Sequence, residues 1–167
     1  DLVAALDDPN QFWRLTAQRL LVSEGHKEAA DILLARVKEP GVGAIHALWA
    51  IEGLQLADVA GEAFAHALVA ADPALRRAAI RALPADQTAA DAFFSTSVLA
   101  DSDPRTRLAA ITKLAEFPKD DERIARAVTG LSMDASLRKS EWFKNAIQAV
   151  GGSGVGSTSF KLGENIL

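Results

Sequence analysis

The chain has 167 residues, of which 49% are hydrophobic and 24% charged, and its formal net charge is −4 with a pI of about 5.4. This apolar content excludes a disordered chain, and the acidic balance makes nucleic-acid binding a poor expectation. The sequence contains no cysteine, which excludes disulfides, thiolate metal ligands, a cysteine nucleophile and attached c-type haem. The length suits one domain, and because no apolar run reaches the length of a bilayer, we predict no membrane insertion.

Helical periodicity is the main signal along the chain. Apolar residues return every three or four positions in 28–37, 59–69, 88–99 and 122–131, as one buried helical stripe requires. Between these stretches, further helices are predicted to begin after Asp-Pro pairs, at 8–9, 72–73 and 103–104. An aspartate there accepts from the free N–H groups of the first turn, and a proline there has no N–H to leave unpaired. Alternating strand patterns are almost absent.

The helices that follow the three Asp-Pro pairs, and two further helical stretches, repeat one pattern. An arginine is followed by an alanine three residues later and a leucine four residues after that, and two copies lack the arginine. The five copies are Arg14/Ala17/Leu21, Ala47/Ala50/Leu54, Arg76/Ala79/Leu83, Arg107/Ala110/Leu114 and Phe143/Ala146/Val150. The alanine allows close approach of a neighbouring helix, and the leucine fills the groove between helices. Because one helix pair cannot bury both of its faces, the pattern predicts an all-α fold, an α-solenoid of about five antiparallel helix pairs over residues 1–150.

This pattern of Asp-Pro, Arg, Ala and Leu resembles HEAT repeats, in particular the short type of phycobilisome lyase-like proteins. The resemblance implies a solenoid for scaffolding or partner binding, with the Asp-Pro helices lining a concave side. Residues 6–22 and 46–54 are similar to the HEAT segment of large bacterial proteins, in which a sugar-dehydrogenase-like propeller precedes the repeats and a haem c domain follows. That similarity implies the helical spacer of a periplasmic or exported electron-transfer protein. Without Cys-x-x-Cys-His or a propeller sequence, no haem or quinone chemistry is assigned to this chain.

The end of the sequence departs from the repeat. Residues 151–159 are rich in glycine and serine, and residues 160–167 carry several apolar side chains. Two interpretations stay open for 151–167: a linker, or a cap that folds back over the last repeat. Since the chain begins at Asp1 without a methionine, we expect a piece of a longer protein.

The recurring arginines are Arg14, Arg76 and Arg107. Each is predicted to bind either a preceding aspartate, such as Asp72 or Asp103, or a carboxylate of the neighbouring repeat. The result would be a ladder of ion pairs that fixes the angle between repeats. The alternative interpretation is a row of anion-binding sites.

The side of these helices opposite the core is the predicted partner-binding face. Counting 100° per residue from the arginine position gives a set of exposed residues on the concave side. They are Thr16, Arg19, Trp49, Glu52, Ala78, Arg81, Ala109 and Thr112, with Lys113 close by. Their chemistry varies from repeat to repeat, as selective binding requires, and Trp49 is the expected anchor. The alternative is that Trp49 is tucked under the next repeat.

The remaining side chains give little sign of catalysis. His26, His46 and His66 lack metal-ligand spacing, and no serine lies in a nucleophile elbow. Pairs of aromatic residues, at 12–13 and 142–143, are expected to cap the hydrophobic ends, with ligand stacking as the alternative. We therefore predict no metal, no cofactor and no enzymatic activity.

The preferred hypothesis is a non-catalytic scaffold that binds a partner protein or a neighbouring domain of its parent chain. A second hypothesis is an accessory module of a redox or lyase-type enzyme that holds a cofactor or chromophore in the groove. A third, a DNA-glycosylase-like solenoid, is disfavoured because it needs a basic groove.

Overall fold

A computed structural model describes residues 1–152. Within this range the chain is helical and has no strand, which confirms the all-α prediction. The α-helices are α1 (Gln11–Ser23), α2 (Ala30–Val37), α3 (Val42–Gly53), α4 (Gly61–Leu68), α5 (Pro73–Ala82), α6 (Gln87–Phe94), α7 (Pro104–Lys113), α8 (Glu122–Met133) and α9 (Glu141–Gly152). Helix α9 continues two residues past the predicted boundary at residue 150. The two interpretations of the tail, a linker or a cap, concern residues 151–167, of which 153–167 lie outside the described range.

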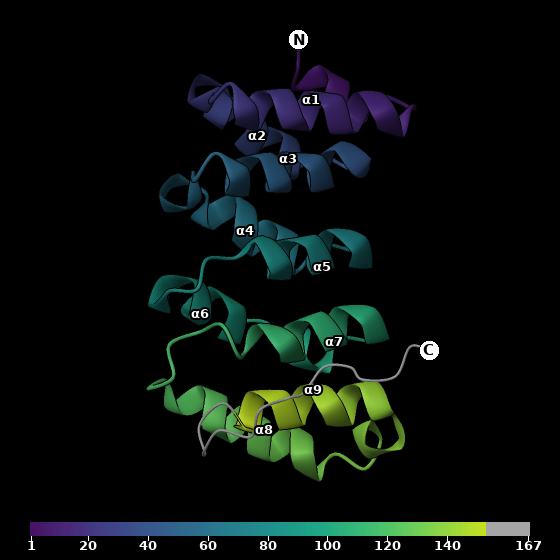
Figure 1. Ribbon diagram of the computed structural model, residues 1–167, viewed down its shortest axis with the longest axis vertical. Coiled ribbons are helices and arrows are strands. Elements are labelled where there is room, and N and C mark those ends of the chain that lie inside the picture. Colours follow the sequence, from purple (N-terminus) through teal and green to yellow (C-terminus); the bar gives the residue numbers. More distant parts are fainter. Residues whose placement is uncertain (153–167) are drawn as a thin grey trace, which may run out of the picture.

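The helices follow one another along the long axis in chain order, from α1 at one end to α8 and α9 at the other (Figure 1). The odd-numbered helices form one layer, in which α1 packs on α3, α3 on α5, α5 on α7 and α7 on α9. Helices α2, α4 and α6 are neighbours in a second layer, and α2, α4 and α8 each pack on the odd-numbered helix that follows. The first unit departs from the predicted pairing, because the short 3-10 helix η1 (Ala4–Asp7) packs on α1 in place of an α-helix.

The ten residues that the sequence assigns to the alanine and leucine positions are all buried in the core. Every one of them is at most 8% exposed: Ala17, Ala50, Ala79, Ala110 and Ala146, then Leu21, Leu54, Leu83, Leu114 and Val150. Fully burying a leucine or valine side chain contributes about 1.5–3 kcal/mol, so these positions dominate the stability of the stack. Their predicted burial is confirmed.

The helix starts follow the predicted capping chemistry in two of three cases. The carboxylate of Asp72 accepts from the backbone N–H of Ala74 at 2.8 Å, and that of Asp103 accepts from Thr106 at 2.7 Å. The third expectation is wrong, because the cap of α1 is Asn10 rather than Asp8. The Asp8 carboxylate instead accepts from the N–H of Asn10 at 2.7 Å, which forms a turn before the helix begins.

The fifth copy of the repeat begins one residue later than predicted. In α1, α5 and α7 the backbone N–H of the repeat arginine donates to the carbonyl of the N-cap residue, and in α9 Lys144 makes this bond to Ser140. Lys144 thus occupies the arginine position, and Phe143, Ala146 and Val150 correspond to Thr106, Ala109 and Lys113 of α7. The spacing between the fourth and fifth copies is irregular because α8 is longer than α6, and for this reason the sequence alone did not reveal the shift.

Candidate functional site

The arginine at the repeat position of α5 joins three segments of the chain. Its Nε and Nη2 donate to the two carboxylate oxygens of Asp101 at 2.7 and 2.8 Å, and Asp101 precedes the next odd-numbered helix. Its Nη1 donates to the carbonyls of Ala70 and Ala71, just before its own helix. The hydrogen bonds from Arg76 hold the pKa of Asp101 below its usual range, and Asp101 raises the pKa of Arg76. Such a two-pronged, charge-assisted contact is strong and directional.

Arg107 makes the equivalent contact one unit further on. Its Nη2 donates to Asp134 Oδ2 at 2.9 Å, and its Nε donates to the carbonyl of Leu99. Hydrogen bonds from Ser136, and after them the bond from Arg107, lower the pKa of Asp134 to about 2. The two arginines therefore bind carboxylates of the following unit.

Arg14 has a neutral partner in the same place. Its Nε lies 3.3 Å from Nε2 of His46 in α3, and His46 Nδ1 lies 2.7 Å from Gln18 Oε1. Because a guanidinium only donates and an amide oxygen only accepts, the ring carries its proton on Nδ1 and is neutral. Burial, and after it the positive charge of Arg14, lower the pKa of His46.

For Arg76 and Arg107 these contacts decide between the two predicted arrangements of the ladder, whereas Arg14 binds no carboxylate and fits neither. The preceding-aspartate version is wrong: Asp72 caps its own helix, and Asp103 accepts from Arg77 of α5 at 3.2 Å while capping α7. Sequence reasoning missed Asp101, which lies two residues before the N-cap of α7. It missed Asp134 as well. Each lies 25 or 27 residues beyond its arginine, close to one repeat, and that spacing was the available signal.

Two further contacts between units were not predicted. Arg36 of α2 pairs through two nitrogens with Asp7, which lowers the pKa of that carboxyl, and Asp7 also accepts from the backbone N–H of Gly43 at 3.1 Å. Arg123 of α8 pairs with Asp91 of α6 at 2.7 Å and also with Asp121, the N-cap residue of its own helix. Arginine–aspartate pairs therefore link successive units in the second layer as well as in the layer of odd-numbered helices.

Four residues of the predicted partner-binding face are exposed and occupy the same position of successive odd-numbered helices. Arg19, Glu52, Arg81 and Thr112 each lie five residues after the repeat position of α1, α3, α5 and α7, and all four are exposed. We call these four residues the outer row. Thr16, which lies beside it, is half-buried.

Other members of the predicted face are not available to a partner. Trp49 is half-buried and packs against the core, so the alternative interpretation describes it better. Ala78 and Ala109 are 5% and 6% exposed because they face the preceding helix. The expectation for Lys113 is wrong: its side chain is 3% exposed, its Nζ donates to the carbonyl of Leu83 at 2.5 Å, and it pairs with Glu116. Its long aliphatic stem lets a cation reach the carbonyl end of α5.

The aromatic pairs do not seal the ends of the stack. Phe12 and Trp13 are 62% and 52% exposed, with their rings edge to face at 5.0 Å, and Trp142 is 77% exposed. Of these aromatic residues only Phe143 is half-buried. The capping expectation is therefore wrong for the other three.

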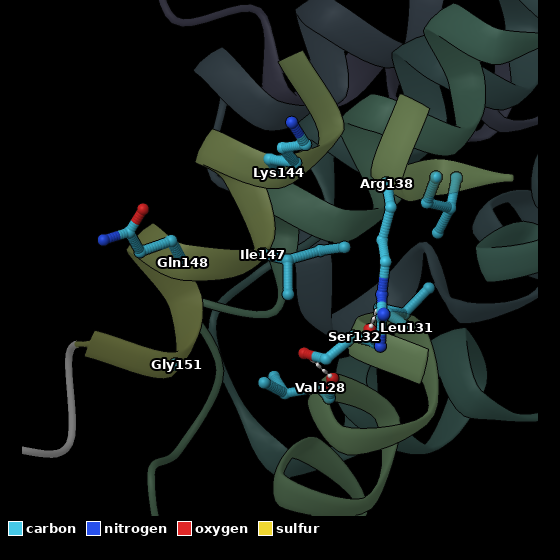
Figure 2. Close-up of a pocket in the computed structure, with 9 residues that line it drawn as sticks. Val128, Leu131, Ser132, Arg138, Lys144, Ile147, Gln148 and Gly151 are labelled. Atoms are coloured by element: carbon cyan, nitrogen blue, oxygen red, sulfur yellow. Dashed lines mark hydrogen bonds between the residues drawn. The ribbon is translucent and has the colours of Figure 1, made fainter. Parts of the chain in front are cut away.

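A cavity of about 390 Å³ lies between α8 and α9 (Figure 2). Its wall is mainly apolar, and its members are Val128, Leu131, Leu137, Ile147 and Gly151, with Ser132, Arg138, Lys144 and Gln148 at the polar side. Arg138 Nε donates to the carbonyl of Ser132 at 2.9 Å, and the Ser132 hydroxyl donates to the carbonyl of Val128. Arg138 and Ser132 thus donate to backbone carbonyls of α8, and Lys144 pairs with Glu141, so the polar side of the cavity offers few unused groups to orient a ligand.

No cluster of three or more His, Asp or Glu side chains within residues 1–152 is placed to hold a metal ion. In the same range no helix has the length and apolar character needed to cross a bilayer. Comparison of the chain with models of protein families and with curated proteins finds no match.

Proposed function

We propose that the chain is an α-solenoid of HEAT-like repeats that acts as a non-catalytic scaffold. It binds a partner protein, or a neighbouring domain of its parent chain, through the outer row of Arg19, Glu52, Arg81 and Thr112. Stacking in chain order, with buried alanine and leucine at each repeat, supports the solenoid.

The observation that carries this proposal is the contrast between two positions of the same helices. The alanine position is filled by the same small residue and is buried in α1, α3, α5 and α7. Five residues after the arginine position, the side chain is exposed and changes from one odd-numbered helix to the next, being Arg in α1, Glu in α3, Arg in α5 and Thr in α7. A constant scaffold with a variable exposed row provides selectivity without changing the fold.

The charges of the row define the partner. Arg19 and Arg81 make no hydrogen bond or ion pair with another residue in the described part of the chain, unlike Arg76 and Arg107. A free guanidinium recognises a carboxylate through two parallel bonds. The partner surface is therefore expected to carry carboxylates opposite α1 and α5, and a cation opposite Glu52 of α3.

Charge reversal at the row tests the proposal. Full-length protein carrying Arg19→Glu and Arg81→Glu is compared with wild type and with a Lys27→Glu, Lys139→Glu control, which makes the same charge change at exposed lysines outside the row. Each is used to capture proteins from an extract of the source cells, with helical content checked by circular dichroism. We expect a protein held by wild type and control to fall at least tenfold with the row variant. Equal capture by all three proteins, or no specific capture by wild type, would reject the row.

A further inference from the structure

Phe117, in the segment that follows α7, packs against both α6 and α7. Its ring centroid lies 5.2 Å from that of Phe93 and 6.4 Å from that of Phe94, the last two residues of α6. The ammonium group of Lys113, which ends α7, lies 5.8 Å from the same centroid. Because Phe117 is only 2% exposed, it fills the space between these helices. The segment directly after an odd-numbered helix thus supplies the side chain that closes this unit.

The last unit has a cavity of about 320 Å³ at the equivalent place. The two phenylalanines of α6 lie seven and eight residues after its N-cap, and Val128 and Thr129 lie equally far after the N-cap of α8. Val150 of α9 corresponds to Lys113, since each lies six residues after the residue at the arginine position. All three line the cavity, and each is smaller than its counterpart. The positions that contact Phe117 in one unit therefore surround an open space in the next.

The chain leaves α9 at the edge of this cavity. The wall is mainly apolar and includes Leu114 and Phe117 from the segment before α8, Ile124 from α8 itself and Gly151 from the end of α9. Helix α9 ends at Gly152, so the chain continues from beside the wall. An apolar side chain that reaches this wall is removed from water, which is favourable.

The segment that follows α9 is the occupant that the preceding unit indicates. Phe117 comes from the segment directly after α7, although α8 and α9 follow it in the chain. A further unit beyond α9 would therefore leave the cavity to residues 153–167 in the same way. Phe160 is the one aromatic residue in the sequence of that segment. The eight residues from Gly152 to Phe160 span at most about 26–29 Å, and residues 153–159 are rich in glycine and serine, so the segment can turn back to the cavity.

We propose that residues 153–162 fold back against α8 and that the side chain of Phe160 occupies the cavity. Phe160 then takes the place beside α8 and α9 that Phe117 takes beside α6 and α7. Burial of the ring supplies the free energy that holds the segment there. Of the two interpretations of the tail, this is the cap rather than the linker, and it closes the cavity to a cofactor or chromophore. The cavity is separate from the outer row, so this proposal does not rest on the proposed function.

Disulfide formation between two introduced cysteines tests this contact, because the chain has no cysteine of its own. Full-length protein carrying Thr129→Cys and Lys161→Cys places one thiol on the cavity wall and the other next to Phe160, whose side chain is kept. The matched control carries Arg126→Cys and Lys161→Cys, which moves the first thiol to an exposed residue of α8 that does not line the cavity. The rate of oxidation is measured on non-reducing gels and by mass, with helical content checked by circular dichroism.

We expect the disulfide within one chain to form at least tenfold faster in the cavity pair than in the control pair, since the bond needs Cβ atoms about 3.5–4.5 Å apart. Adding Phe160→Ala should lower the rate of the cavity pair to that of the control. Equal rates in the two pairs would overturn the proposal, and so would a fast cavity pair that Phe160→Ala leaves unchanged. A disulfide-linked dimer as the main product of the cavity pair would also overturn it, because Phe160 of a second copy would then be the occupant.

Discussion

Helix α5 is held on its two sides by different means. Toward α7 the contact includes the Arg76–Asp101 pair, the Arg77–Asp103 pair and the buried cation of Lys113. Toward α3 the positions equivalent to Arg76 and Asp101 are Ala47 and Ala70. Both junctions nevertheless bury the same alanine and leucine positions of the repeat.

The difference between the two junctions separates the apolar packing that both share from the ion pairs that only one has. Packing of small and large apolar side chains is present at both junctions and carries the hydrophobic stabilisation. The ion pair is an addition, and a buried pair adds little net stability over well-packed apolar groups. Removing only one partner of the pair destabilises the fold, since it leaves a buried charge without compensation.

The largest expected effect is therefore the loss of one partner at the polar junction. Asp101→Ala leaves Arg76, whose side chain is 15% exposed, without its carboxylate, and should cost about 3 kcal/mol. Urea denaturation at pH 7 measures this change. Because Arg76 lowers the pKa of Asp101, this stability is present above the unfolded-state pKa of about 3.9 and is lost as the pH falls through the folded-state pKa. The variant should accordingly lose less stability between pH 5 and pH 2 than wild type.

The double change Arg76→Met, Asp101→Ala is the control that makes the polar junction resemble the apolar one. It should recover at least about 1 kcal/mol relative to Asp101→Ala alone, because no unpaired guanidinium is left behind. If the double variant costs the sum of the two single changes, the pair is not coupled and the comparison of junctions fails.

The contact of η1 with α2 and α3 sharpens the comparison, since it combines close packing with a polar contact. A Cβ at position 43 would overlap the carboxylate of Asp7, which accepts from the Gly43 N–H and pairs with Arg36. Gly43→Ala is expected to cost about 2 kcal/mol by displacing Asp7. Thermal denaturation of the full chain measures it.

Gly130→Ala is the matched control for this change. Gly130 lies inside α8, and a Cβ there would meet nothing within 4 Å. Alanine restricts the unfolded chain, so this variant should gain about 0.5–1 kcal/mol. A gain at both glycines would show that Asp7 adapts without cost.

The sequence predicted the repeat well because its signals are local. Alanine and leucine spacing located the buried positions, and Asp-Pro marked the starts of α5 and α7. These local signals could not identify the carboxylates that the arginines bind. Asp72 and Asp103 are close in sequence and were chosen for that reason, although a side chain that caps its own helix is already engaged. Asp101 becomes a neighbour of Arg76 only when one repeat is superposed on the next.

The candidate face was predicted less well for a related reason. A rotation of 100° per residue assigns one exposed side to a helix, but α3, α5 and α7 each have an odd-numbered neighbour on two sides. Ala78, Ala109 and Lys113 lie on the second of these contacts and are buried. Lysine is seldom fully buried, so no single-sequence rule would have placed Lys113 there. The exposure of the outer row was predicted correctly because its four residues lie between the two contacts.

The smallest predicted effect concerns the neutral contact between α1 and α3, where His46 stands in for a carboxylate. Burial and Arg14 lower the pKa of His46, so the folded state resists protonation and the unfolded state does not. Stability is therefore complete above the unfolded-state pKa of about 6.5 and declines as the pH falls below it. His26 has the opposite sign: Glu28 and Glu24 raise its pKa, so its contribution is present at low pH and is lost as the pH rises through the folded-state value. Urea denaturation from pH 7.5 to 5.5 should show a decline that His46→Gln removes and His26→Gln steepens. If the stability of His46→Gln still declines over this pH range, the pKa of His46 in the wild type is not lowered by Arg14. The contact between Arg14 and His46 would then not correspond to the Arg76–Asp101 pair.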